Sequence, residues 1–122
     1  MAKVKTNELI GAALDWAVGV AEGRQPGAYK GVVRATAHPD CPDSPPMFGP
    51  ELNYSTDWAQ GGPILDRERI TIRQWTNMPI IHAYMPHDGA PWGAGPTPLI
   101  AAMRCFCCSR LGREIEVPDE LL

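Results

Sequence analysis

Apolar residues recur at helical spacing in two segments, one near each end of the chain. In residues 6–22 they fall three and four positions apart on one face: Leu9, Ala13, Trp16, Ala17 and Val20. This spacing is typical of an amphipathic helix. We expect Thr6 to cap its N-terminus and Gly23 to take the left-handed conformation that often ends a helix.

The second segment comprises residues 98–111, where an apolar stripe is formed by Ile100, Met103, Cys107 and Leu111. Thr97 is the expected N-cap, and Pro98 occupies the first helical position, which tolerates proline because its N–H would have no partner there. Gly112 follows the last turn. The signals for the start, the period and the end agree, so we predict a second helix.

Alternating apolar and polar positions predict strands between the two helices and after the second one. The clearest are residues 69–75, where isoleucines alternate with arginine and threonine, and residues 78–85. The short turn at residues 76–77 predicts that these two strands form a β-hairpin. Residues 29–36 and 114–117 are further strand candidates.

These elements predict an α+β fold in a single domain spanning residues 1–122. A small antiparallel sheet would pack against an N-terminal and a C-terminal helix, because a one-sided sheet buries its apolar face under helices. A chain of 122 residues is long enough to form one hydrophobic core. Its 13 prolines and 12 glycines are concentrated in the middle, so we expect long Gly/Pro-rich loops at residues 38–50 and 86–98.

The charge balance and the lengths of the apolar runs argue against two classes of partner. The chain has 14 acidic and 11 basic residues and a formal net charge of −3, without a long run of like charge. This pattern does not favour a nucleic-acid-binding surface. No apolar run approaches the roughly 20 residues of a bilayer span, and the N-terminal residues do not resemble a signal peptide. We expect no nucleic acid, no membrane and a cytoplasmic location.

The most informative segment for ligand binding is residues 54–63, a short polar and aromatic stretch that ends in two glycines and a proline. We expect Ser55 to cap a short helical turn that runs through Gln60, with free backbone N–H groups as donors. Aromatic rings would supply flat walls, polar side chains directional hydrogen bonds, and the glycines close access to the backbone. The candidate ligand-binding residues here are Tyr54, Ser55, Asp57, Trp58, Gln60, Gly61 and Gly62. The alternative is a purely structural capped turn with Trp58 in the core.

A second candidate is the glycine-rich segment at residues 93–98, which leads directly into the second helix. Unpaired N–H groups at a helix N-terminus can bind an anion, and Thr97 would add a hydroxyl. Arg73 on a predicted strand and Arg104 on the second helix would supply positive charge. The structural alternatives are a loop joined to a well-capped helix and a solvated strand face.

Neither a metal site nor a catalytic centre is indicated by the spacing of reactive residues. Cys105, Cys107 and Cys108 would diverge around the second helix, so we expect buried thiols instead of disulfides or metal ligands. The other candidates fit no standard zinc spacing: His38, Cys41, His82 and His87. Without a recognisable nucleophile motif, we predict no catalytic residue, no metal and no cofactor.

Three sequence blocks resemble the NinX family of small proteins from tailed bacteriophages and prophages. They are residues 9–18 (LIGAALDWAV), residues 54–63 (YSTDWAQGGP) and residues 95–104 (GPTPLIAAMR). The proline-rich stretch at residues 39–50 and the cysteine cluster lie outside this resemblance. The resemblance implies a phage accessory protein that acts on the host, in host takeover or counter-defence, and implies no particular chemistry.

We therefore expect a non-enzymatic phage accessory protein that binds, and sequesters, a small anionic or nucleotide-like ligand. A homo-oligomer is expected, because small domains often complete a pocket across a two-fold interface. One alternative is a protein-binding inhibitor of a host factor, with Phe48, Met85 or Trp92 as anchors. Another is a small hydrolase or transferase that uses Asp57 or a histidine.

Overall fold

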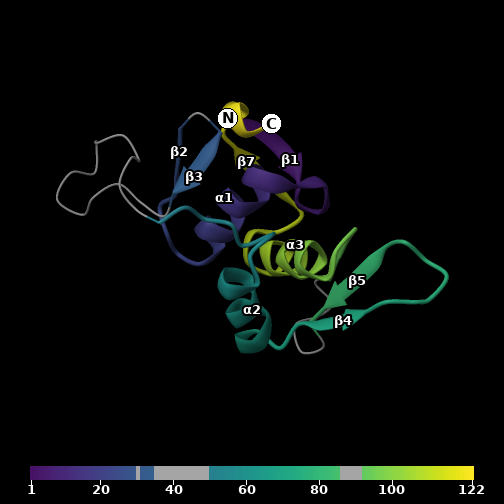
Figure 1. Cartoon of the computed structure of the whole chain (residues 1–122). Coiled ribbons are helices and arrows are strands. Elements are labelled where there is room, and N and C mark those ends of the chain that lie inside the picture. The colour runs from purple at the N-terminus through teal and green to yellow at the C-terminus, as the bar shows by residue number, and fades with distance from the viewer. Residues whose placement is uncertain (30, 35–49, 86–91) are drawn as a thin grey trace.

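The computed structural model describes residues 1–29, 31–34, 50–85 and 92–122, and these form an α+β fold (Figure 1). Its helices are α1 (Gly11–Ala21), α2 (Trp58–Arg67) and α3 (Pro98–Leu111), with short 3-10 turns η1 (Thr6–Glu8) and η2 (Asp119–Leu121). Its strands are β1 (Ala2–Lys5), β2 (Gly27–Tyr29), β3 (Val32–Arg34), β4 (Thr71–Arg73), β5 (Ile81–Tyr84), β6 (Trp92–Gly95) and β7 (Glu114–Val117). The predicted fold class and both predicted terminal helices are confirmed.

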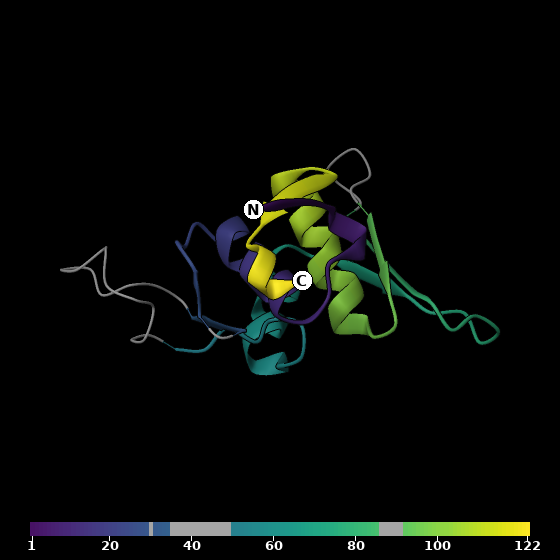
Figure 2. The same cartoon turned by 90° about the horizontal axis from the view of Figure 1, so that it is seen from above.

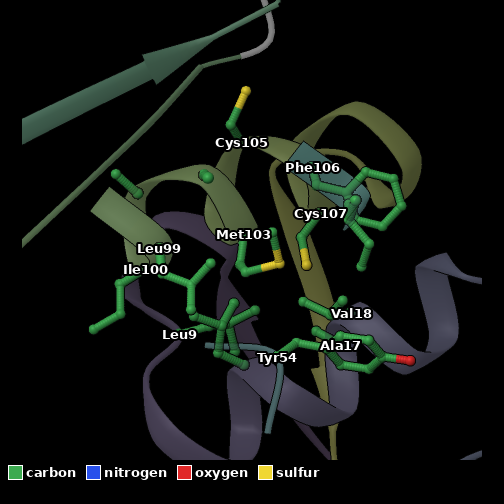
Figure 3. Packing of buried hydrophobic residues seen from close by; sticks show 14 of the residues in the cluster. Leu9, Ala17, Val18, Tyr54, Leu99, Ile100, Met103, Cys105, Phe106 and Cys107 are labelled. Atoms are coloured by element: carbon green, nitrogen blue, oxygen red, sulfur yellow. The ribbon is translucent and has the colours of Figure 1, made fainter. Parts of the chain in front are cut away.

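Helix α3 lies at the centre of the fold and is buried on several sides. Its buried residues are Leu99, Ile100, Ala101, Ala102, Met103, Cys105, Phe106 and Cys107, which is typical of a core helix surrounded by other elements. Figure 3 shows Met103 and Cys107 pointing toward Ala17 and Val18 of α1, whereas Cys105 points away from them. The other elements therefore pack around α3.

Strands β4, β5 and β6 form an antiparallel sheet in that spatial order, with Ile72 opposite Ala83 and Ala83 opposite Gly93. The predicted hairpin is confirmed as β4–β5, although both strands are shorter than expected. Its tip projects from the body of the molecule (Figures 1 and 2). The loop expected at residues 86–98 is wrong for residues 92–95, which form β6, while residues 86–91 lie outside the described part of the chain.

Two glycines allow β6 to approach α3 closely. A Cβ atom at Gly93 would clash with the backbone nitrogen of Cys105 and would lie 2.5 Å from the carbonyl oxygen of Ala101. A Cβ atom at Gly95 would lie 2.8 Å from Cγ2 of Ile100. The Gly-Ala-Gly sequence is therefore a packing requirement of the strand.

A strand that the sequence analysis did not predict, β1, joins the two ends of the chain. It pairs antiparallel with β7, with Val4 opposite Ile115, and the predicted strand at residues 114–117 is confirmed. The expected cap role of Thr6 is wrong, because α1 begins at Gly11 and the buried Thr6 hydroxyl donates to the carbonyl oxygen of Gly112 at 2.6 Å. Both termini consequently lie near each other (Figure 2).

The strand predicted at residues 29–36 is a hairpin in the described part of the chain. Strands β2 and β3 pair antiparallel, and Gly31 between them has a positive φ of 78°. Residues 35–49 lie outside the described part of the chain, and they include nearly all of the loop expected at residues 38–50. Gly23 and Gly112, expected after the two helices, also have positive φ angles, of 83° and 87°.

Helix α2 was not predicted beyond a single turn, and it packs on α3 through a glycine. A Cβ atom at Gly61 would clash with the carbonyl oxygen of Tyr54 and lie 2.7 Å from Cδ1 of Leu99. At the neighbouring Gly62 the nearest atom would be Cε3 of Trp58, at an ordinary 3.7 Å. The two glycines of the sequence motif therefore have different structural requirements.

We predict that Gly61→Ala and Gly93→Ala each lower the free energy of unfolding by about 1–3 kcal/mol, because the added methyl group overpacks a tight contact. Gly62→Ala is the matched control, and it should be neutral or stabilising by up to about 1 kcal/mol, since alanine favours a helix over glycine. Urea unfolding of the three variants and the parent protein measures these differences in the free energy of unfolding. Equal effects at Gly61 and Gly62 would contradict the described packing.

Candidate functional site

Tyr54 and Ser55, at the start of the predicted ligand-binding segment, are buried. Tyr54 is only 6% exposed, and Ser55 is buried beside α1. The backbone N–H of Ser55 donates to Oδ1 of Asp15 at 2.8 Å. This hydrogen bond joins the segment to α1.

The polar residues of the same segment organise the start of α2. The expected capping by Ser55 is wrong, since the N-cap is Asp57, whose Oδ1 accepts from the backbone N–H of Ala59 at 2.9 Å. The Gln60 side chain accepts from the N–H of Asn53 at 2.7 Å and donates to the carbonyl oxygen of Glu51 at 3.0 Å. These groups therefore satisfy local backbone atoms.

Trp58 behaves differently from its neighbours in the segment. Its side chain is 53% exposed, so the structural alternative that placed it in the core is wrong. It stays available for contact with a ligand or partner.

The remaining predicted residues are dispersed. Thr97 caps α3 as expected, because its hydroxyl oxygen accepts from the N–H of Ile100 at 3.1 Å. Arg73 is exposed on β4, with its guanidinium 5.7 Å from the centre of the Trp75 ring and 5.9 Å from that of Tyr84. The middle segment and the start of α3 do meet, through the Gly61 and Leu99 contact, and that contact is close packing.

The carboxyl group of Asp15 is a buried acid in the core. Burial raises its pKa above the ordinary 3.8, the hydrogen bond from the backbone N–H of Ser55 opposes this rise, and the charge of Glu51 adds to it. The charged form of Asp15 is therefore disfavoured inside the fold.

A cavity of about 450 Å³ lies beside β6 and α3. Its lining residues are Asn7, Pro79, Ile80, Trp92, Ala94, Gly95, Pro96 and Arg104. The wall is mostly apolar, with one cation and one amide. Trp92 is 49% exposed there. Such a mixture is typical of a small-molecule site.

Arg104 is the charged group of this cavity and is half-buried in its wall. Its Nε donates to the carbonyl oxygen of Leu9 at 2.8 Å, and its Nη1 donates to that of Ala94 at 2.6 Å. It forms no ion pair with a carboxylate among the described residues, and burial lowers its pKa. The positive charge is thus held by neutral dipoles and is not neutralised.

Asn7 stands beside Arg104 and is fixed by the same strand. Its Oδ1 accepts from the backbone N–H of Ala94 at 3.2 Å. This bond orients the amide so that its nitrogen can donate to a bound group.

A second cavity, of about 390 Å³, shares Asn7 and Trp92 with the first. It is further lined by Lys5, Cys108, Arg113 and Glu114. The two cavities therefore adjoin along one surface, which we call the Trp92 groove.

The cysteine cluster provides no reactive group in the core. Burial raises the pKa of the Cys105 thiol to about 12 and also raises that of Cys107. Both are reduced thiols outside any disulfide, as expected. Among the residues that the structure describes, no three metal-ligating side chains converge.

Of the ten predicted ligand-binding residues, Arg104 is the one that lines either cavity. Trp92 was expected to anchor a protein partner, whereas Lys5, Asn7, Ile80 and Arg113 were not among the predicted ligand-binding residues. The alternation of small, charged and apolar residues in β1 could have indicated a strand, but nothing in the sequence places β1 beside β6.

No helix in the described ranges is long and apolar enough to cross a bilayer. A family model described as "Bacteriophage P22, NinX" matches residues 5–110. A search of curated proteins finds no match.

We predict that Asp15→Asn becomes more stable relative to the parent protein as the pH rises from about 3 to 7. Because folding raises the pKa of Asp15, stability from this group is greatest below pH 3.8 and is lost as the pH rises through the folded-state pKa. Asparagine keeps an acceptor for Ser55 and cannot ionise. Urea unfolding over a pH series measures this, with the exposed Asp66→Asn as control. A stability difference that does not change with pH would refute it.

Proposed function

The chain belongs to the NinX family of bacteriophage P22, and we propose that this phage accessory protein binds a small anionic or nucleotide-like ligand in the Trp92 groove without turning it over. The matched residues 5–110 include all three sequence blocks on which the predicted resemblance rests. The family itself indicates no ligand, so the proposal rests on the geometry of the groove.

The observation that carries the proposal is the set of partners of the half-buried Arg104 guanidinium, which are two backbone carbonyls. A half-buried guanidinium that lacks a carboxylate partner among the described residues is costly to leave unpaired. Two backbone carbonyls hold it in place and carry only partial negative charge. An anionic group in the cavity would complete its coordination with charge-assisted hydrogen bonds.

The walls of the groove favour a ligand that also has a flat apolar part. Trp92 is about half exposed, and Ile80 and Pro96 line the same cavity. A base or another planar ring could lie against these side chains, because aromatic surfaces stack at low conformational cost. The amide of Asn7 would supply a directional hydrogen bond.

Binding without turnover is supported by the roles of the candidate acid–base residues. Asp57 caps α2, and the His82 ring packs edge-on against Trp75 at 5.4 Å. Each of these groups has a structural partner outside the groove. A small hydrolase or transferase is the alternative, and a chemically altered ligand would support it.

We predict that one of a panel of nucleoside mono-, di- and cyclic phosphates raises the melting temperature of the protein. A ligand at one hundred times its dissociation constant stabilises the fold by about 2.7 kcal/mol, which is roughly 10 °C for a chain of this size. Trp92→Ala should weaken that binding at least about tenfold, through loss of the stacking face. Trp58→Ala removes a similarly exposed tryptophan outside the groove and should leave the affinity within about twofold.

The opposite pattern, with Trp58→Ala impaired and Trp92→Ala normal, would place the site at the middle segment instead. Chromatography of the ligand after denaturing the complex separates binding from catalysis. Intact ligand supports a binder, and a chemically altered ligand would show turnover.

A second candidate function, inhibition of a host protein, is favoured by the β4–β5 hairpin. The hairpin projects from the body of the molecule (Figure 2), and Trp75, Met78 and Ile80 between its two strands are exposed. Exposed apolar groups of this kind mark interaction surfaces. Met85 is buried and is no anchor, and Phe48 lies outside the described residues. If no nucleotide shifts the melting temperature, and Met78→Asp abolishes capture of one host protein, this function replaces the first. The predicted homo-oligomer stays a prediction.

A further inference from the structure

We infer that the second cavity, between β1 and the start of β7, is an anion subsite that receives the phosphate of a nucleotide whose ring lies against Trp92. This inference rests on the proposed function and adds the chemical class of the ligand and the residues that select it. The two cavities share Asn7 and Trp92, so a single ligand can occupy both.

The charges of the groove differ from those of the whole protein. The chain carries a formal net charge of −3, yet the two cavities together are lined by three cations, Lys5, Arg104 and Arg113, and one carboxylate, Glu114. Positive charge is therefore concentrated where the molecule is hollowed, which raises the local concentration of anions.

The two cations of the second cavity are available to a ligand. The Glu114 carboxylate lies 3.5 Å from Nζ of Lys3, which is not a lining residue. In the described part of the chain neither Lys5 nor Arg113 forms an ion pair with a carboxylate. An ammonium group and a guanidinium without counter-ions can together hold a phosphate.

The backbone that carries these cations is fixed before any ligand binds. Thr6 donates from its backbone N–H to the carbonyl oxygen of Arg113 at 2.8 Å and from its hydroxyl to that of Gly112 at 2.6 Å. Lys5 is paired with Glu114 across β1 and β7. The cavity is thus built on a rigid junction, which reduces the entropy lost on binding.

The C-terminal end of α3, which borders the second cavity, disfavours a bound anion. Cys108 lines the cavity in the last turn of α3, where the helix dipole is negative and opposes an anion. Lys5 and Arg113 oppose this unfavourable dipole, so we expect removal of both charges to weaken the selectivity for phosphate.

The test compares a nucleotide with its nucleoside, adenosine 5′-monophosphate with adenosine and guanosine 5′-monophosphate with guanosine, by calorimetry. We expect Lys5→Gln with Arg113→Gln to weaken nucleotide binding at least about tenfold, since the loss of two cations removes the attraction for phosphate. Nucleoside binding should stay within about twofold. Arg24→Gln with Arg69→Gln, which removes two exposed cations that do not line the cavities, should change neither affinity.

Pyrophosphate alone is the second probe, and it separates this inference from the proposed function. Binding of pyrophosphate to the parent protein but not to the Lys5→Gln and Arg113→Gln double variant supports the subsite, even if no nucleoside or nucleotide binds and the proposed function fails. Nucleotide binding that the double variant retains would overturn the subsite and leave the proposed function standing. Loss of both nucleotide and nucleoside in that variant, or no binding of any probe, would also overturn the subsite.

Discussion

The close packing of strand β6 on helix α3 determines how Trp92 and Arg104 are placed in the Trp92 groove. Gly93 and Gly95 bring the strand's backbone against α3, where a methyl group would clash. At this separation the Arg104 side chain, which extends from α3, donates to the carbonyl oxygen of Ala94 on β6. The same strand positions Trp92 at its start. A side chain at either glycine would displace β6 from α3, and a close-packed interior would transmit that displacement to Trp92 and Arg104.

The pairing of β1 with β7 is the second constraint, and it closes the groove from the other side. This pairing places Lys5 and Asn7, near the N-terminus, beside Arg113 and Glu114, which follow α3. Lys5 and Arg113 are more than one hundred positions apart in the sequence. Bringing them together costs loop-closure entropy, which is offset only when both strands form and pair. The groove is consequently a property of the complete fold rather than of one motif.

The sequence predicted the elements whose signals are local. Helix α3 follows from its period and its Thr97 cap, and the β4–β5 hairpin follows from alternation. Only one turn of helix α2 was predicted, because Gly61, Gly62 and Pro63 have low helix propensity. In the structure, packing of Gly61 against Leu99 overrides that propensity. Strand β6 has little side-chain alternation to reveal it, since two of its residues are glycines selected by contact with a distant helix.

The candidate site was harder to predict for a related reason: the meaning of a charged or aromatic residue depends on its partners. Asp57 and Gln60 have the chemistry of ligand-binding residues, but each satisfies backbone groups nearby. Arg104 has partners too, and these are carbonyls, which orient a guanidinium without cancelling its charge. Much of its side-chain entropy is then already lost before a ligand arrives, while its positive charge is still available. A guanidinium held by carbonyls in a mostly apolar wall, with no carboxylate partner in the described ranges, differs in this way from an ordinary surface arginine.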